Sequence, residues 1–191
     1  MNKEQEKLVE MFSDGLRMIM IVQRNKEGGK SNEPQKYAKK KITRNKEEFY
    51  QVLEEFKEIK EESEEPLRIY SCLNRRDINK AIREFKKRQL DNDYSDQTSR
   101  EAFYHDIKNR WISCLMKPSS REETLFLIDI DEPEKNSLEM TKKHLEEIGV
   151  EIITDYETKN GYHLITSPFN QSLFDGKFGE LKKDALLLLD Y

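Results

Sequence analysis

Two aspartates at the end of an apolar run are the residues of this chain best placed to do chemistry. Residues 125–128 are apolar and have the length of a buried strand, and Asp129 and Asp131 follow them in a D-x-D spacing. Because alternate residues of a strand point to the same face, the two carboxylates should lie side by side. Carboxylate oxygens are the ligands that hard divalent cations such as Mg²⁺ prefer. The pattern therefore predicts a site for a divalent metal at the end of this strand.

A β-hairpin is predicted further along the chain, and it carries a second group of polar residues. Runs of alternating polar and apolar residues flank the Asn-Gly pair at 160–161, which is the strongest short signal for a two-residue type I′ turn. With that turn, Thr158 would lie opposite His163 on one face of the hairpin. Together with Lys159, these side chains would form a cluster of the size that binds a phosphate group.

The two patterns together resemble the signature of a known family, the archaeo-eukaryotic primase superfamily, which includes the small catalytic primase subunit and primase-polymerases. That signature is an apolar strand ending in D-x-D, a small residue two positions before a His on a hairpin strand, and a later strand that carries a third acid. The sequence LIDID at 127–131 resembles the first part and KNGYH at 159–163 the second, in the same order and with a predicted helix between them. The resemblance covers residues 122–191.

The resemblance implies that the acids form a catalytic metal site. Asp129 and Asp131 would hold catalytic Mg²⁺ or Mn²⁺, as the two acids of the family do. The third acid should fall in LKKDALLLLDY at 181–191, where Asp184 precedes the apolar run and Asp190 ends it. Asp184 is the slightly preferred candidate, so the expected metal ligands and catalytic acids are Asp129, Asp131 and Asp184.

The resemblance also implies a nucleotide site and a function. His163 would act as a catalytic residue that contacts the phosphates of an incoming nucleoside triphosphate, with Lys159 and Thr158 as further nucleotide-binding residues. The implied activity is primase- or polymerase-like nucleotidyl transfer in DNA replication. The implied partners are a nucleoside triphosphate, a DNA or RNA template and other replication proteins, and the Lys- and Glu-rich composition resembles that of phage proteins.

Two other classes of function fit parts of the same pattern. A phosphatase of the haloacid-dehalogenase type also opens with a strand that ends in D-x-D, although Glu132 and Pro133 stand where that family usually has Thr or Val. A catalytically inactive module of the same fold would instead use the pocket and the basic regions to bind a nucleotide or a protein. In that case, substitution of Asp129 or His163 should leave its biological activity intact.

Composition limits the classes of protein to which this chain can belong. Of its 191 residues, 35% are hydrophobic and 38% are charged, which predicts one domain with a modest core and a heavily solvated surface. No apolar run has the length of a membrane span and no targeting pattern opens the chain. We therefore expect no membrane partner and a cytoplasmic location, in the host cytoplasm for a phage protein. Cys72 and Cys114 stand far apart without a zinc-binding pattern and are predicted to be buried thiols.

Basic residues gather in two parts of the chain, although its net charge is −4. Residues 24–46 contain nine basic and two acidic side chains, and a second basic group begins where a predicted strand meets a helix. Clustered Lys and Arg bind the nucleic-acid backbone, but the same patterns are also common on solvated surfaces. The candidate nucleic-acid contacts are Lys39, Lys40, Lys41, Arg75 and Arg76.

Hydrophobic periodicity predicts a fold of the α/β (α+β) class, in which helices flank a mixed central β-sheet. The expected helices are 3–13, 46–60, 75–90, 100–116 and 136–148, and the expected strands are 16–24, 67–73, 125–128, the two hairpin arms and 185–191. A turn and a short helix are expected between the hairpin and the last strand. The catalytic half should be 122–191, and 1–121 should form a supporting, nucleic-acid-contacting half of the same globule.

Overall fold

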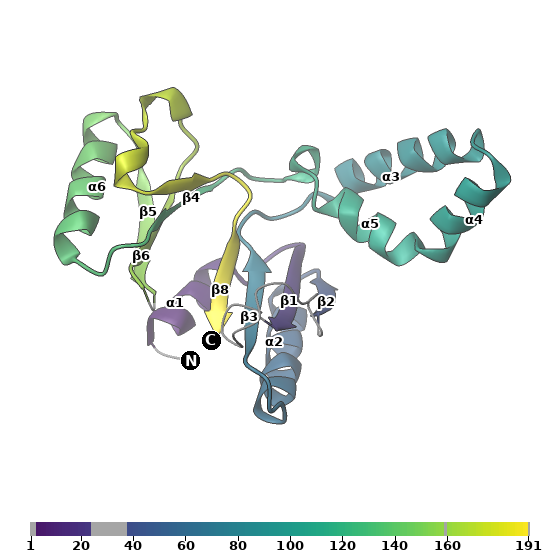
Figure 1. The fold of residues 1–191 in the computed structure, drawn as a ribbon, viewed down its shortest axis with the longest axis horizontal. Coiled ribbons are helices and arrows are strands. Elements are labelled where there is room, and N and C mark those ends of the chain that lie inside the picture. The colour runs from purple at the N-terminus through teal and green to yellow at the C-terminus, as the bar shows by residue number, and fades with distance from the viewer. Residues whose placement is uncertain (1–2, 24–37, 159, 191) are drawn as a thin grey trace. The chain divides into compact units, whose positions relative to one another are not determined.

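The computed structural model describes residues 3–23, 38–158 and 160–190, and it has a mixed α+β architecture. The described residues form six α-helices and two four-stranded antiparallel sheets (Figure 1). They divide into two compact units. The described residues of 1–73 and 124–191 form the first, called the sheet unit, and residues 74–123 form the second, called the helical insert.

The first sheet of the sheet unit has the strand order β2-β1-β3-β8, and every pairing in it is antiparallel. Alternation along the strands sends Ile19, Ile21 and Ile69 to one face, where they are fully buried. Helix α2 covers that face with Phe49 and Phe56, and the side chain of Asn45 caps its first turn. The elements are α1 (Lys3–Phe12), β1 (Arg17–Gln23), β2 (Ala38–Thr43), α2 (Lys46–Glu61), β3 (Leu67–Cys72) and β8 (Leu186–Asp190).

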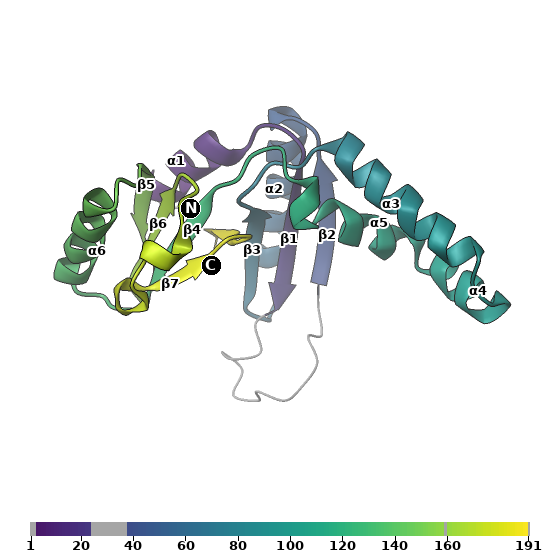
Figure 2. The same ribbon diagram turned by 90° about the horizontal axis from the view of Figure 1, so that it is seen from above.

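The second sheet has the strand order β5-β6-β4-β7 and is covered on one face by helix α6 (Figure 2). Ile128, Ile130 and Leu164 form a core with Leu138 and Leu145 of α6. The helix is amphipathic, because its apolar residues recur at helical spacing. The elements are β4 (Phe126–Ile130), α6 (Lys135–Glu147), β5 (Ile152–Glu157), β6 (Tyr162–Thr166) and β7 (Glu180–Lys182).

The opposite face of the second sheet belongs to the core of the first. Leu127, Tyr156 and Ile165 lie in the same cluster of buried residues as Leu187 and Leu189 of β8. Because neighbouring residues on a strand point to opposite faces, β4 contributes to both cores. The second sheet therefore lies between α6 and the first sheet.

The expected single mixed sheet is wrong, because the strands form two sheets that are each wholly antiparallel. Strands β4 and β5 are joined by a helix and run in the same direction, as in a mixed sheet, but β6 lies between them and pairs with both. Strands β7 and β8 follow one another along the chain and yet belong to different sheets. The expected division into a supporting half and a catalytic half concerns function and stays a prediction.

The helical insert has an aromatic core of its own. Phe85 packs against Phe103 and Trp111, with ring centroids 5.9 and 5.8 Å apart. The single helix expected over 100–116 is two helices, because the backbone leaves helical geometry at Asp106, with φ −106° and ψ 25°. Every helix within 3–23, 38–158 and 160–190 is too short or too polar to span a lipid bilayer. The insert consists of α3 (Ile78–Asp93), α4 (Gln97–His105) and α5 (Ile107–Leu115).

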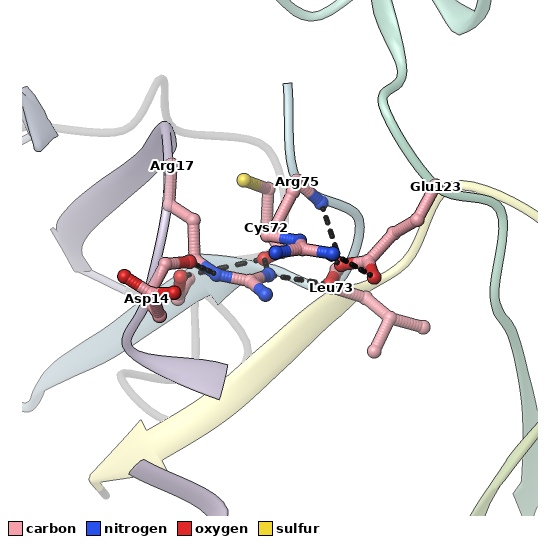
Figure 3. A network of polar contacts seen from close by, with 7 residues as sticks. Asp14, Arg17, Cys72, Leu73, Arg75 and Glu123 are labelled. Carbon is pink, nitrogen blue, oxygen red and sulfur yellow. Dashed lines mark hydrogen bonds and ion pairs between the residues drawn. The ribbon is translucent and has the colours of Figure 1, made fainter. Parts of the chain in front are cut away.

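The buried side chain of Arg17 ties the start of β1 to the end of β3 (Figure 3). Its Nη1 donates to the carbonyl oxygens of Cys72 at 3.1 Å and Leu73 at 2.6 Å, and its Nε donates to the carbonyl oxygen of Asp14 at 2.8 Å. The backbone N–H of Leu73 donates to the carbonyl oxygen of Ala185, next to β8, at 3.0 Å. One guanidinium therefore satisfies three carbonyl groups beside the point where β3 pairs with β8.

We expect Arg17→Met to lower the free energy of unfolding by about 2–3 kcal/mol, because it leaves buried carbonyl groups without their donor. Urea denaturation followed by circular dichroism measures the change. The control is Arg44→Met, since Arg44 is 74% exposed and pairs with Glu48 at the surface, where an ion pair contributes little. Equal losses in the two variants would contradict the anchoring role of Arg17.

Candidate functional site

A cavity of about 410 Å³ lies between the two sheets of the sheet unit. The second sheet and its hairpin loop contribute Asp129, Asp131, Thr158, Asn160, His163 and Lys182, and the first sheet with the residues beside it contributes Met20, Val22, Arg68, Tyr70, Leu186 and Leu188. The structure thus brings together four of the residues predicted from the sequence, Asp129, Asp131, Thr158 and His163. It adds two basic residues that sequence reasoning missed, Arg68 and Lys182.

The carboxylate of Asp129 is held from both neighbouring strands. His163 lies directly opposite it on β6, with Nε2 3.0 Å from Oδ1, and Lys182 reaches across from β7, with Nζ 2.5 Å from Oδ2. The hydrogen bond from His163 lowers the pKa of Asp129, whereas burial of the carboxylate raises it. The hydrogen bond from Lys182 lowers the pKa further, to about 2. Asp129 is therefore ionised at neutral pH although its side chain is only 16% exposed.

Tyr156 orients the ring of His163. It lies directly opposite His163 on β5, with its hydroxyl oxygen 2.7 Å from Nδ1. Burial, and then the charge of Asp129, raises the pKa of Tyr156 well above its usual value, so the hydroxyl keeps its proton. A protonated Tyr156 can donate to Nδ1 while Nε2–H donates to Asp129, which fixes the direction in which the imidazole points.

The register of the hairpin differs from the predicted one. The sequence pattern predicts Thr158 opposite His163, but Tyr156 lies there instead. The connection is residues 158–161, and the N–H of Thr158 closes it by donating to the carbonyl oxygen of Gly161 at 2.8 Å. Gly161, the second central residue of the predicted type I′ turn, does not have the positive φ that this turn requires, so the prediction of that turn is wrong.

Two glycines let the strands beside β4 approach it closely. A Cβ atom at Gly161 would lie 1.9 Å from the carbonyl oxygen of Ile130. A Cβ atom at Gly179 would lie 2.8 Å from the carbonyl oxygen of Asp129, and Gly179 also has a φ of +131° that other residues rarely adopt. The Gly of the G-x-H pattern therefore has a steric role, since it brings the start of β6 against the end of β4.

Glu180 is an acidic residue beside this cavity that sequence reasoning missed, and it lines a neighbouring cavity together with Asp129 and Asp131. It begins β7 directly opposite Asp129, and Lys182 lies two residues further on the same face. The sequence suggests a turn and a short helix in this part of the chain. Strand β7 has only three residues, which is too short for alternation to reveal it, so only its pairing with β4 identifies it as a strand.

The two acids proposed from the sequence as the third metal ligand lie elsewhere. Asp184 is exposed in the turn after β7, and it does not line the cavity. Asp190 lies on β8 in the first sheet, with Oδ2 2.8 Å from Nζ of Lys60 on α2. Glu180, and neither of these two acids, lies directly opposite Asp129 on the neighbouring strand.

The carboxylates of the site suit a hard divalent cation. In the part of the chain that the structure describes, no three His, Cys, Asp or Glu side chains are grouped to hold a metal ion. The ammonium of Lys182 instead lies between two carboxylates, 2.5 Å from Oδ2 of Asp129 and 3.1 Å from Oε2 of Glu180. A cation thus already bridges these acids, and carboxylate oxygens are the donors that Mg²⁺ and Mn²⁺ prefer. The donor set fits such an ion in place of the ammonium, with Asp131 as a further acid on the cavity wall.

Alternation along β2 divides the run of three lysines. Lys39 and Lys41 point toward α2, where both pair with Glu55. Lys40 lies directly opposite Met20 of β1, which lines the cavity, so Lys40 is on the cavity face of the first sheet. Of the three, only Lys40 is on the side where a ligand in the cavity would lie.

The two predicted arginines of the helical insert make contacts inside that insert. Nε of Arg75 is 3.1 Å from Oε1 of Glu123 (Figure 3). Arg76 is 1% exposed, and its Nη1 lies 3.4 Å from the carbonyl oxygens of Met116 and Lys117. Both side chains therefore hold the insert together. Lys159, predicted to bind the nucleotide, lies outside the described residues.

We expect Gly161→Ala to lower the free energy of unfolding by about 1–3 kcal/mol, because the added methyl group must displace the end of β4. Urea denaturation measures the loss. Gly176→Ala is the matched control, since a Cβ atom there meets nothing within 4 Å. If both variants unfold like the wild type, β6 does not press on β4 as described.

The stability of the chain should depend on pH through Asp129. Its pKa is about 2 in the folded chain and higher in the unfolded chain, so the unfolded state binds more protons in acid. The resulting stabilisation, about 2 kcal/mol, is fully present above about pH 4 and is lost as the pH falls toward 2. Urea denaturation of wild type and Asp129→Asn between pH 7 and pH 2 should give curves that converge in acid, and parallel curves would contradict this account.

Comparisons of the chain with protein-family models, with curated proteins and with solved structures found no match. The resemblance to the primase superfamily therefore rests on the D-x-D and G-x-H patterns of the sequence.

Proposed function

We propose that the chain carries out primase- or polymerase-like nucleotidyl transfer, with a nucleoside triphosphate as substrate and Mg²⁺ or Mn²⁺ as cofactor. The observation that supports this best is the cavity whose wall holds the carboxylates of Asp129 and Asp131 together with His163. Its volume of about 410 Å³ lies in the range of sites for small molecules. A DNA or RNA template and other replication proteins belong to the same proposal.

Basic side chains and the imidazole N–H of His163 would bind the triphosphate from both walls. Lys182 and His163 lie beside Asp129 on the wall formed by the second sheet, and Arg68 lies on the wall formed by the first. Arg68 is only 8% exposed, and a guanidinium that is partly removed from water binds phosphate oxygens strongly and in a fixed direction. Thr158 adds a hydroxyl group. Lys40 lies on the face of the first sheet that lines the cavity, directly opposite Met20.

The acids would hold the divalent ion, with Asp129 and Glu180 as the first candidates and Asp131 as the third. A divalent ion, when bound, supplies positive charge against the triphosphate and lowers the pKa of an attacking hydroxyl group. The chain itself supplies orientation. Tyr156 fixes the ring of His163, so its N–H points in one direction.

A module that binds a nucleotide without turning it over is the second candidate. It is favoured by one observation: both carboxylate oxygens of Asp129 already accept hydrogen bonds, from His163 and Lys182.

Isothermal titration calorimetry of a nucleoside triphosphate, with and without Mn²⁺, tests the proposal. We expect binding that requires Mn²⁺, and we expect Asp129→Asn to weaken it by about 100-fold or more, because the substitution removes a carboxylate ligand. Asp91→Asn, an exposed aspartate of the helical insert, is the control and should bind like the wild type. Binding that ignores both the metal and Asp129, or no binding at all, would overturn the proposal.

Extension of a primed template then separates the enzyme from the binding module. The enzyme should lengthen the primer only with Mn²⁺ or Mg²⁺ and only with Asp129 intact. A chain that binds the triphosphate in the Asp129-dependent way but leaves the primer unchanged is the binding module.

A further inference from the structure

The ammonium of Lys182 occupies the position between two acids that a bridging metal ion would need. Its Nζ lies 2.5 Å from Oδ2 of Asp129 and 3.1 Å from Oε2 of Glu180. A lysine ammonium carries a positive charge at neutral pH. The two acids therefore already have a cation between them when the chain is alone.

The fold makes this contact a consequence of strand geometry. Glu180 and Lys182 are separated by one residue on β7, so their side chains lie on one face, and that face is shared with Asp129 on β4. The absence of a Cβ atom at Gly179 lets the start of β7 lie against the backbone of Asp129. Both neighbours of the ammonium are therefore set by the pairing of β7 with β4.

A divalent ion and this ammonium exclude one another. Because His163 holds Oδ1 of Asp129, an ion bound to Asp129 would have to use Oδ2, the oxygen that Lys182 contacts, and two positive charges so close together would repel strongly. Lys182 can move away, because it has a long flexible stem and its side chain is 37% exposed. It also lines the cavity, so it can turn toward an anion there.

We propose that Lys182 is an exchangeable internal cation, which holds Asp129 and Glu180 in the ligand-free chain and yields them to the divalent ion that enters with a triphosphate. This inference rests on the proposed function. Released Lys182 then pairs with a phosphate oxygen, which returns part of the ion-pair energy lost at the two acids. Metal alone should consequently bind weakly, and metal together with a triphosphate should bind well.

The test is Mn²⁺ binding in the absence of nucleotide, followed by electron paramagnetic resonance of free Mn²⁺. We expect Lys182→Met to tighten Mn²⁺ binding by about tenfold or more, because the metal no longer competes with an ammonium. Lys182→Gln, which removes the charge and keeps a hydrogen-bond donor, should show the same gain. The matched control is Lys142→Met, since the ammonium of Lys142 also lies between two carboxylates, those of Glu139 and Asp155, on α6 and β5.

Each outcome separates the inference from the proposed function. A gain in both Lys182 variants and none in Lys142→Met supports the exchange. Unchanged Mn²⁺ affinity in both Lys182 variants, with binding still lost in Asp129→Asn, overturns the exchange and leaves the metal site standing. If neither the wild type nor any Lys182 variant binds Mn²⁺, with or without a triphosphate, both the proposed metal site and the exchange are overturned. Thermal unfolding of each variant confirms that it is folded in the assay.

Discussion

The charge of Asp129 on an inner strand is the constraint around which the second sheet is built. A carboxylate removed from water at this depth is costly unless cationic groups or hydrogen-bond donors reach it. Strand β4 has a neighbour on each side, and each neighbour supplies one such group, His163 from β6 and Lys182 from β7. A shift of either strand by one residue would turn its donor side chain to the opposite face. Compensation of one charge therefore helps to specify both strand pairings.

Local signals in the sequence were sufficient for most of the helices and for the longer strands. Apolar residues at helical spacing and the cap at Asn45 identify α2, and unbroken apolar runs identify β1 and β4. The D-x-D and G-x-H patterns are local too. They identify Asp129, Asp131 and His163, and all three line one cavity in the structure. In each of these cases the deciding information lies within a few neighbouring residues.

The parts that the sequence did not reveal depend on contacts between distant segments. Glu180 and Lys182 lie beside Asp129 only because β7 pairs with β4. A strand of three residues is too short to show a periodicity in the sequence. Arg68 faces the cavity because the chain forms two sheets, which no local pattern encodes. The hairpin register failed for another reason, since Gly161 does not adopt the positive φ that a type I′ turn uses at its Asn-Gly pair.

The pairing of β3 with β8 has a consequence for synthesis of the chain. Strand β3 is made early, but β8 follows only after the helical insert and the whole second sheet. On the ribosome, one edge of β3 thus stays open while those segments emerge, and unpaired edges are prone to join other chains. The helical insert has short-range contacts and its own aromatic core, so it can fold during this interval. The order of synthesis therefore leaves the first sheet to be completed last.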